Sequence, residues 1–124
     1  MSDHAELDYC YLTTTGRLSG APHRIEIWFA LHEEALYLLA GDGERSDWVR
    51  NLMISSDVVV ELADRRRTTR ARVVEAGTEE DALARRLLFD KYTARGNTDL
   101  EDWAASALPV AIDWPVATTY TSLI

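Results

Sequence analysis

The chain has 124 residues, of which 47% are hydrophobic, and this length and composition predict one globular domain over residues 1–124 with a single core. The formal net charge of −8 argues against general nucleic-acid binding, which depends on Lys and Arg to neutralise phosphates. No apolar run approaches the roughly 20 residues of a membrane span, and the start MSDHAELD lacks a signal-peptide pattern, so we expect a cytoplasmic protein without a membrane span.

The first predicted elements form a β-hairpin. Residues from Tyr9 to Thr14 are rich in aromatic and β-branched side chains, and residues from His23 to Ala30 alternate between apolar and polar ones. The loop between the two strands is rich in glycine and contains Arg17 and Ser19. Such a loop can offer backbone amides and a guanidinium to an anionic ligand.

The middle of the chain predicts a third strand at Ala35–Ala40 and then a helix with Ser46 as its N-cap. Val58–Leu62 is the fourth strand, and the fifth runs from about Arg67 to Glu75. The three arginines at 65–67 follow Asp64 between these strands. This position favours a solvated hairpin turn over a binding patch.

Two helices and a final strand are predicted in the last third. Thr78, followed by three acidic residues, begins a helix that ends at Gly96. Thr98 and Glu101 form a second capping box, which predicts a further helix before Pro109, and the sixth strand ends at Trp114. The order βββ-α-ββ-αα-β predicts a mainly-β protein, a mostly antiparallel six-stranded barrel with helices, because barrel closure removes exposed edges.

The segment GDGERS at 41–46 was weighed as a dinucleotide fingerprint. It follows a strand and opens a helix, but Ser46 replaces the third glycine and only one βαβ-like unit is present. A Rossmann site is therefore not favoured. The helix start, with Arg45 and Arg50 nearby, can still receive a phosphate or carboxylate. The alternative is a plain helix cap with a solvated Arg50.

Other catalytic and metal motifs are absent from the sequence. His4, His23 and His32 do not cluster at ligand spacing, and Cys10 is a single cysteine, so no metal site is predicted. Ser19 lies in GRLSG, which lacks the glycine position of a nucleophile elbow.

Glu26 and Trp28 share one face of the second strand and allow two interpretations. An outward Trp beside a carboxylate suggests a pocket wall or a subunit interface. Alternatively, Glu26 forms a cross-strand ion pair with Arg70 or Arg72, and Trp28 packs under a helix.

Five segments together resemble the deazaflavin-dependent nitroreductase/quinone reductase family, within the FMN-binding split-barrel superfamily: YLTTTGRLSG, DWVRNL, VVVEL, RARVVE and ALPVAIDW. The resemblance implies a six-stranded split β-barrel, often a homodimer. It also implies an oxidoreductase in which reduced deazaflavin (coenzyme F420) gives hydride to a small-molecule quinone, nitro or activated-alkene acceptor. In such enzymes the cofactor supplies the chemistry, and the protein positions and tunes it.

The resemblance also assigns a cofactor site. The hairpin loop would surround the anionic tail, the segment after the third strand would flank the phosphate, and the following helix would support both. The implied cofactor-binding residues are Arg17, Ser19, Gly20, Gly41, Arg45, Ser46, Asp47, Trp48 and Arg50.

The chain departs from the family pattern at three positions. Leu18 and Asp42 stand where many members have basic residues, and Glu26 stands where members often have Pro. Aspartate in place of a phosphate-facing lysine replaces an attractive charge with a repulsive one. The alternatives are therefore an FMN-binding reductase of the same fold, or a non-catalytic module that binds a cofactor or dimerises.

Overall fold

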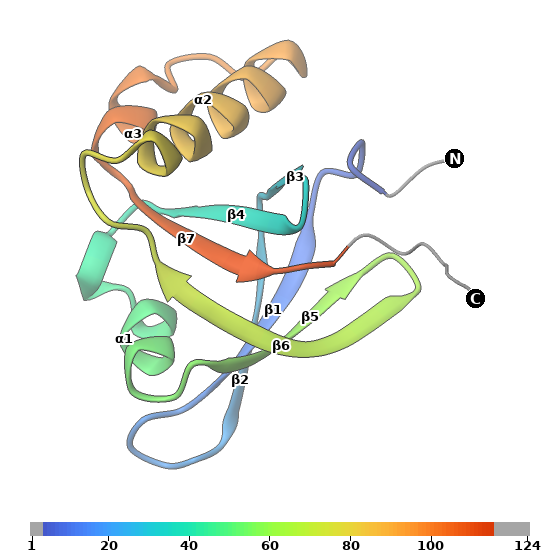
Figure 1. The fold of residues 1–124 in the computed structure, drawn as a ribbon, viewed down its shortest axis with the longest axis vertical. Coiled ribbons are helices and arrows are strands. Elements are labelled where there is room, and N and C mark those ends of the chain that lie inside the picture. Colours follow the sequence, from blue (N-terminus) through green and yellow to red (C-terminus); the bar gives the residue numbers. More distant parts are fainter. Residues whose placement is uncertain (1–3, 116–124) are drawn as a thin grey trace.

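The computed structural model describes residues 4–115 and shows seven strands, three α-helices and one short 3-10 helix within them (Figure 1). The helical elements are η1 (Gly43–Arg45), α1 (Asp47–Ile54), α2 (Glu79–Ala94) and α3 (Glu101–Ser106). The strands are β1 (Cys10–Thr15), β2 (Pro22–Ile27), β3 (Ala30–His32), β4 (Ala35–Ala40), β5 (Asp57–Leu62), β6 (Arg65–Val73) and β7 (Leu108–Asp113).

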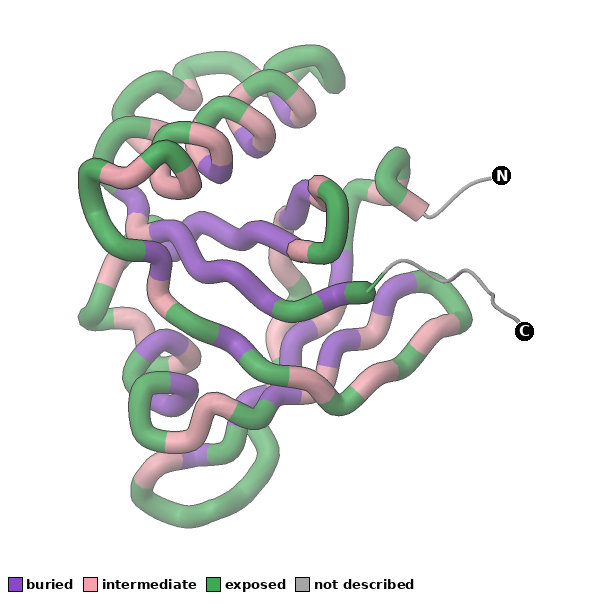
Figure 2. Tube along the Cα trace, viewed as in Figure 1, coloured by how far each residue is buried: buried purple, intermediate pink, exposed green. Residues whose placement is uncertain are grey.

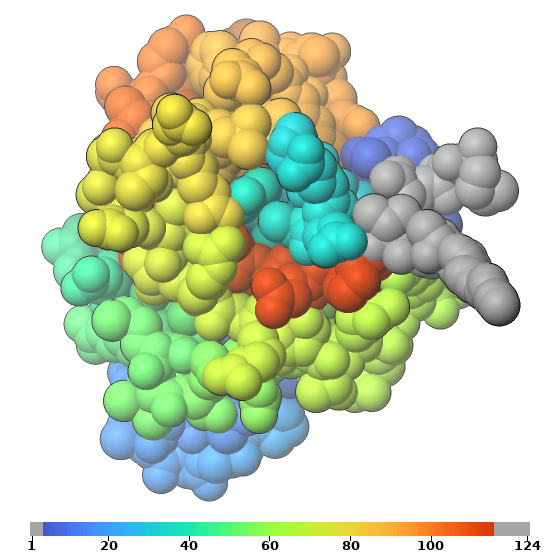
Figure 3. All heavy atoms as spheres, viewed as in Figure 1, coloured from blue at the N-terminus to red at the C-terminus, as the bar shows by residue number. Residues whose placement is uncertain are grey.

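All strand pairs are antiparallel, and the sheet has the order β2-β1-β5-β6-β7-β4-β3. The sheet curls into a half-barrel, so the predicted mainly-β, split-barrel fold is confirmed. In the space-filling view β7 lies between the β3–β4 hairpin and β6 (Figure 3). The antiparallel order contains no βαβ crossover, which removes the structural basis for a Rossmann site.

The strand count differs from the prediction because the expected second strand is broken. Trp28 and Phe29 separate β2 from β3, and the backbone of Phe29 pairs with side chains of α2. Its N–H donates to the hydroxyl of Tyr92 at 2.9 Å, and its carbonyl accepts from Lys91 Nζ at 2.9 Å. These bonds replace strand pairing at Phe29, so the chain changes direction there.

Two apolar clusters make up the core. One fills the inside of the curled sheet and contains Leu12, Leu38 and Ile112. The other lies between the sheet and α2 and contains Leu88 and Tyr92. Figure 2 shows buried residues along β4 and β7, under helices whose outer faces are exposed.

The predicted N-cap of α2 is confirmed, whereas the predicted N-cap of α3 is wrong. Thr78 Oγ1 accepts from the N–H of Asp81 at 3.1 Å, as the sequence predicted. By contrast, α3 begins at Glu101 with Leu100 in the N-cap position and no side-chain cap. Asp99 adopts a left-handed conformation with φ of 62°, which separates Thr98 from the helix start.

The arginine triplet lies in the β5–β6 hairpin, as predicted. Arg66 Nε is 3.9 Å from the carboxylate of Glu61, and the guanidinium of Arg65 lies 4.7 Å from the ring centre of Trp114. Arg65 and Arg66 are therefore engaged by nearby residues of the same chain, as expected of a hairpin and not of a binding patch.

We predict that Tyr92→Phe lowers the free energy of unfolding by about 1–3 kcal/mol, because the buried N–H of Phe29 loses its acceptor. Urea denaturation followed by circular dichroism measures this loss. Tyr11→Phe is the matched control, because no hydrogen bond of the Tyr11 hydroxyl is found within residues 4–115. Equal stability of the two variants would contradict the prediction.

Candidate functional site

The hairpin loop is fastened to α1 by Arg17 and Asn51. The backbone N–H of Arg17 donates to Asn51 Oδ1 at 3.1 Å, and its Nη1 donates to the same oxygen at 2.9 Å. Asn51 is 2% exposed, and its Nδ2 donates to Thr14 Oγ1 at 3.1 Å. Arg17 Nη2 also lies 3.3 Å from Asp47 Oδ1. The guanidinium is therefore held in one place by the first two turns of α1.

These contacts border a groove of about 270 Å³, which we call the loop groove. It is lined by Gly16, Arg17, Leu18, Ser19, His23, Asp47 and Asn51. Within the part of the chain that the structure describes, the backbone N–H groups of Leu18 and Ser19 make no hydrogen bond. Together with the Arg17 cation, these amides give the groove donors suited to an anion.

The conformation of the loop depends on two of its glycines. Gly20 has φ of +76°, a left-handed conformation that other residues adopt only with strain. At Gly16 a Cβ atom would lie 2.7 Å from His23 Nε2, so any larger residue would push this imidazole away. The loop is thus shaped by specific contacts.

Most of the segment after β4 lies outside the loop groove. Of its predicted residues, only Asp47 lines the groove. Arg50 Nε donates instead to the carbonyl of Glu44 at 3.0 Å, and Trp48 packs partly buried against the core. Arg45 is exposed. Ser46 takes the N-cap position without a side-chain cap bond. The cofactor roles of these residues, and of Gly20 and Gly41, stay predictions.

A second pocket, of about 580 Å³, lies where β2 meets α3, and we call it the aromatic pocket. Trp28 stacks on Tyr92 with 4.0 Å between ring centres, and it meets Trp103 at 88° and 5.5 Å. The pocket is lined by Tyr9, Glu26, Ile27, Trp28, Leu39, Leu100 and Trp103.

Both interpretations of Trp28 therefore hold in part, because it packs against α2 and also lines the aromatic pocket. The ion-pair interpretation of Glu26 is wrong. Arg70 pairs with Asp57 at 3.8 Å, and Arg72 pairs with Glu80 at 2.7 Å. Within residues 4–115 Glu26 forms no ion pair, and its exposed side chain lines the aromatic pocket.

Sequence reasoning missed the role of Trp103 and the anchoring role of Tyr92. Both lie on amphipathic helical stripes, which predict core positions. Trp103 is only partly buried and lies 3.8 Å from where a Cβ of Gly41 would be. No local pattern indicates the pocket, because Trp28 and Trp103 are 75 positions apart and their proximity is visible only in the fold.

The side chains of Lys91 and Cys10 have strongly shifted pKa values. Burial, followed by repulsion from Arg95, lowers the pKa of Lys91 to about 8. Its Nζ lies 3.7 Å from the ring centre of Phe29. Burial raises the pKa of the Cys10 thiol to about 12, so this thiol is protonated at neutral pH and is a poor nucleophile.

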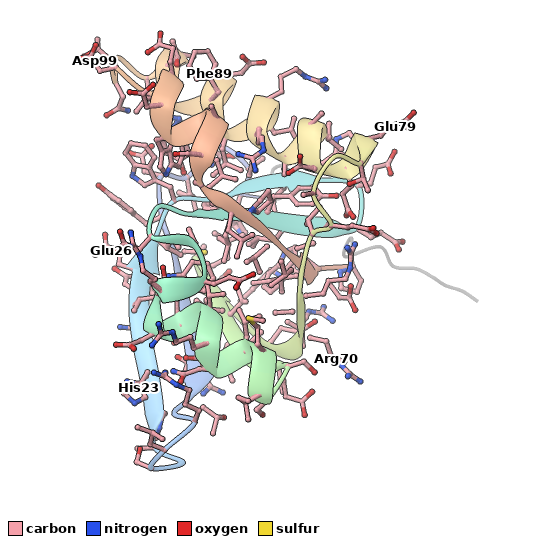
Figure 4. The ribbon with its side chains drawn as sticks, turned by 90° about the vertical axis from the view of Figure 1, so that its left-hand side faces the viewer. His23, Glu26, Arg70, Glu79, Phe89 and Asp99 are labelled. Carbon is pink, nitrogen blue, oxygen red and sulfur yellow. The ribbon has the colours of Figure 1, made fainter. Side chains whose placement is uncertain are left out.

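The loop groove and the aromatic pocket lie at opposite ends of β2. His23 lines the first, Glu26 and Ile27 line the second, and Figure 4 looks onto the side where His23 and Glu26 lie along this strand. The four residue steps of strand from His23 to Ile27 span about 13 Å. The two sites share no lining residue, and His23 and Glu26, three residues apart on the strand, point to opposite faces of it.

Two further features are absent from residues 4–115. No group of three or more His, Cys, Asp or Glu side chains there could hold a metal ion. None of the helices in this range is both long and apolar enough to cross a membrane.

Comparison with solved structures finds the same fold in several proteins. An F420-H2-dependent reductase has a TM-score of 0.67 and 22% identity, over 86% of this chain and 96% of that one. HutZ, the heme storage protein from Vibrio cholerae, has a TM-score of 0.69 and 14% identity, over 95% of this chain and 88% of that one. A structure described as a domain-swapped dimer has a TM-score of 0.67 and 22% identity, over 86% and 81%. No curated protein matches the chain.

Fold and site together define a split-barrel protein with an arginine-bearing loop and an aromatic pocket along one strand. The family model for F420H(2)-dependent quinone reductases matches residues 3–115. The chain belongs to this family. The family's description names reduced F420, so the prediction of a deazaflavin over FMN is confirmed at the level of the family.

We predict that Asn51→Ala lowers the free energy of unfolding by about 1–3 kcal/mol, since Thr14 and Arg17 both lose a buried partner. Hydrogen exchange should also become faster at the amide of Arg17, which loses its acceptor, and by a larger factor than in β5, where the rate follows only the loss of global stability. Met53→Ala, on an exposed position of the same helix, is the control. Unchanged exchange at Arg17 would show that Asn51 does not hold the loop.

The lowered pKa of Lys91 predicts that the protein becomes more stable at alkaline pH. Its pKa is about 8 in the folded state against 10.5 for an ordinary lysine, so between these values the unfolded chain binds more protons. The free energy of unfolding therefore rises with pH in this window. Urea denaturation at pH 7.5, 9 and 10.5 should show a rise in wild type relative to Lys91→Met. A constant difference between the two proteins would contradict the shift.

Proposed function

We propose that this protein is an F420H2-dependent oxidoreductase that reduces a small quinone, nitro compound or activated alkene. The observation that carries the proposal is the pairing of an arginine-bearing groove and an aromatic pocket along one strand, in a chain of this family. Reduced deazaflavin supplies a hydride when it is bound. The residues of the chain bind it, orient it and exclude water around it.

The loop groove would hold the anionic tail. Arg17 provides the positive charge, and the free amides of Leu18 and Ser19 provide further donors. Asn51 fixes the guanidinium before any ligand arrives, so little conformational entropy is lost on binding. This preorganisation supports anion binding in a chain whose net charge is −8.

The aromatic pocket would receive the acceptor beside the ring of the cofactor. Trp28 and Trp103 offer flat apolar surfaces, and Leu39 of β4 and Leu100 at the start of α3 add aliphatic ones. Such walls bind planar molecules and keep water away from the reacting carbon. Nothing in this arrangement requires an acid or base from the protein.

A non-catalytic binding module is the second candidate. It is favoured by the contact between Arg17 and Asp47, which neutralises part of the charge that an anionic cofactor would use. We also propose a homodimer, in line with the neighbour described as a domain-swapped dimer, and a cytoplasmic location. Light scattering of the purified protein tests the dimer.

The cofactor is tested by titrating the purified protein with F420 and with FMN, each oxidised and reduced, while fluorescence and melting temperature are followed. We expect binding of F420 and oxidation of F420H2 by a quinone such as menadione. Binding of FMN alone would overturn the deazaflavin assignment. Binding of F420 without turnover of any quinone, nitro or alkene acceptor would favour the non-catalytic module.

We predict that Arg17→Ala weakens F420 binding about ten- to hundredfold, because a hydrogen bond to a charged group contributes about 1.5–3 kcal/mol. Fluorescence titration gives the dissociation constants. Arg70→Ala removes an equal charge from an exposed pair on β6 and is the matched control. An unchanged affinity in folded Arg17→Ala protein would remove Arg17 from the site.

A further inference from the structure

The aromatic pocket contains one charged side chain among its lining residues, and that charge is not neutralised by a neighbour. Glu26 is exposed at the end of β2, and no ion pair involves it within the range 4–115. The other lining residues are aromatic or aliphatic. A ligand in this pocket therefore meets one carboxylate against an otherwise uncharged wall.

The nearest cation on the same strand is already engaged. Arg24 Nε lies 2.8 Å from Glu61 Oε1, and its guanidinium lies 4.0 Å from the ring centre of Tyr11. Arg24 is two residues from Glu26 and faces the same side of the sheet. Because Arg24 is paired with Glu61, its charge offsets that of Glu26 only weakly.

Aromatic rings form much of the remaining lining of the pocket. Trp28 and Trp103 meet at 88°, so the two rings form two perpendicular walls, and Tyr9 lies beside them. Tyr92 covers one face of Trp28 and holds it in place. The faces of aromatic rings carry partial negative charge and attract cations, Trp most strongly.

We propose that the aromatic pocket binds a cationic group, a quaternary ammonium or a protonated amine, carried by the acceptor molecule. This inference rests on the proposed function for the identity of the occupant as an acceptor, but binding of the cation itself needs no cofactor. Glu26 is the specificity-determining residue. Acceptors with a carboxylate at this place are disfavoured, because like charges repel.

The test uses two probes of equal shape, choline and its uncharged isostere 3,3-dimethylbutan-1-ol. Each is titrated into the full-length protein without cofactor, and tryptophan fluorescence is followed, since two of the four tryptophans line the pocket. We expect choline to bind about tenfold more tightly than the alcohol, from the combined effect of the carboxylate and the rings.

Three variants separate the contributions. Glu26→Gln keeps the size of the side chain and should reduce the preference for choline to threefold or less. Trp103→Leu should weaken choline binding while the charge remains. Glu34→Gln, an equal loss of charge at an exposed position away from the pocket, should leave the preference unchanged. Melting temperatures confirm that each variant is folded.

Equal binding of the two probes, no measurable binding of choline, or an unchanged preference in Glu26→Gln would each overturn the inference. F420 is titrated separately into the same samples by absorbance. Binding of F420 without a preference for choline would leave the proposed function intact and remove the cation site. A preference for choline without F420 binding would keep the cation site and overturn the proposed function.

Discussion

The hydroxyl of Tyr92 is the contact on which the arrangement of the site depends. It accepts from the N–H of Phe29 and donates toward the carbonyls of Phe29 and Asp8, which brings α2, the β2–β3 break and the N-terminal segment together. The same residue stacks on Trp28. One side chain thus ends a strand and supports, from behind, the indole of Trp28 that lines the aromatic pocket.

Electrostatics divide the site into two ends with opposite preferences. At the start of β2 a single arginine is held by Asn51 and Asp47 against an acidic background. At the other end Glu26 forms no ion pair within residues 4–115, while the neighbouring Arg24 is paired with Glu61. A ligand that spans the strand would therefore place negative charge near Arg17 and apolar or positive groups near Glu26.

The order and type of the elements could be predicted from the sequence because they depend on local patterns. Alternation of apolar residues located the strands, and the cap at Thr78 was correct because its partner Asp81 is three residues away. The break at Phe29 could not be seen, since the bonds that cause it come from a residue 63 positions later. Arg17 and Ser19 were predicted to lie in one loop, and both line the loop groove. The partner of Arg17 could not be predicted, because Asn51 lies 34 positions away. Trp103 was assigned to the core because helical spacing does not distinguish a packed face from a pocket wall.

The position of β7 has a consequence for how the chain folds during synthesis. This strand is the last in the sequence that the structure describes, yet it lies inside the sheet between β4 and β6. Until it leaves the ribosome, β4, whose residues are almost all buried in the finished fold, has one unpaired edge. An apolar strand with a free edge is a template for pairing with other chains. The nascent chain is therefore most prone to aggregate just before β7 emerges, and insertion of this strand completes both the sheet and the surface on which α2 packs.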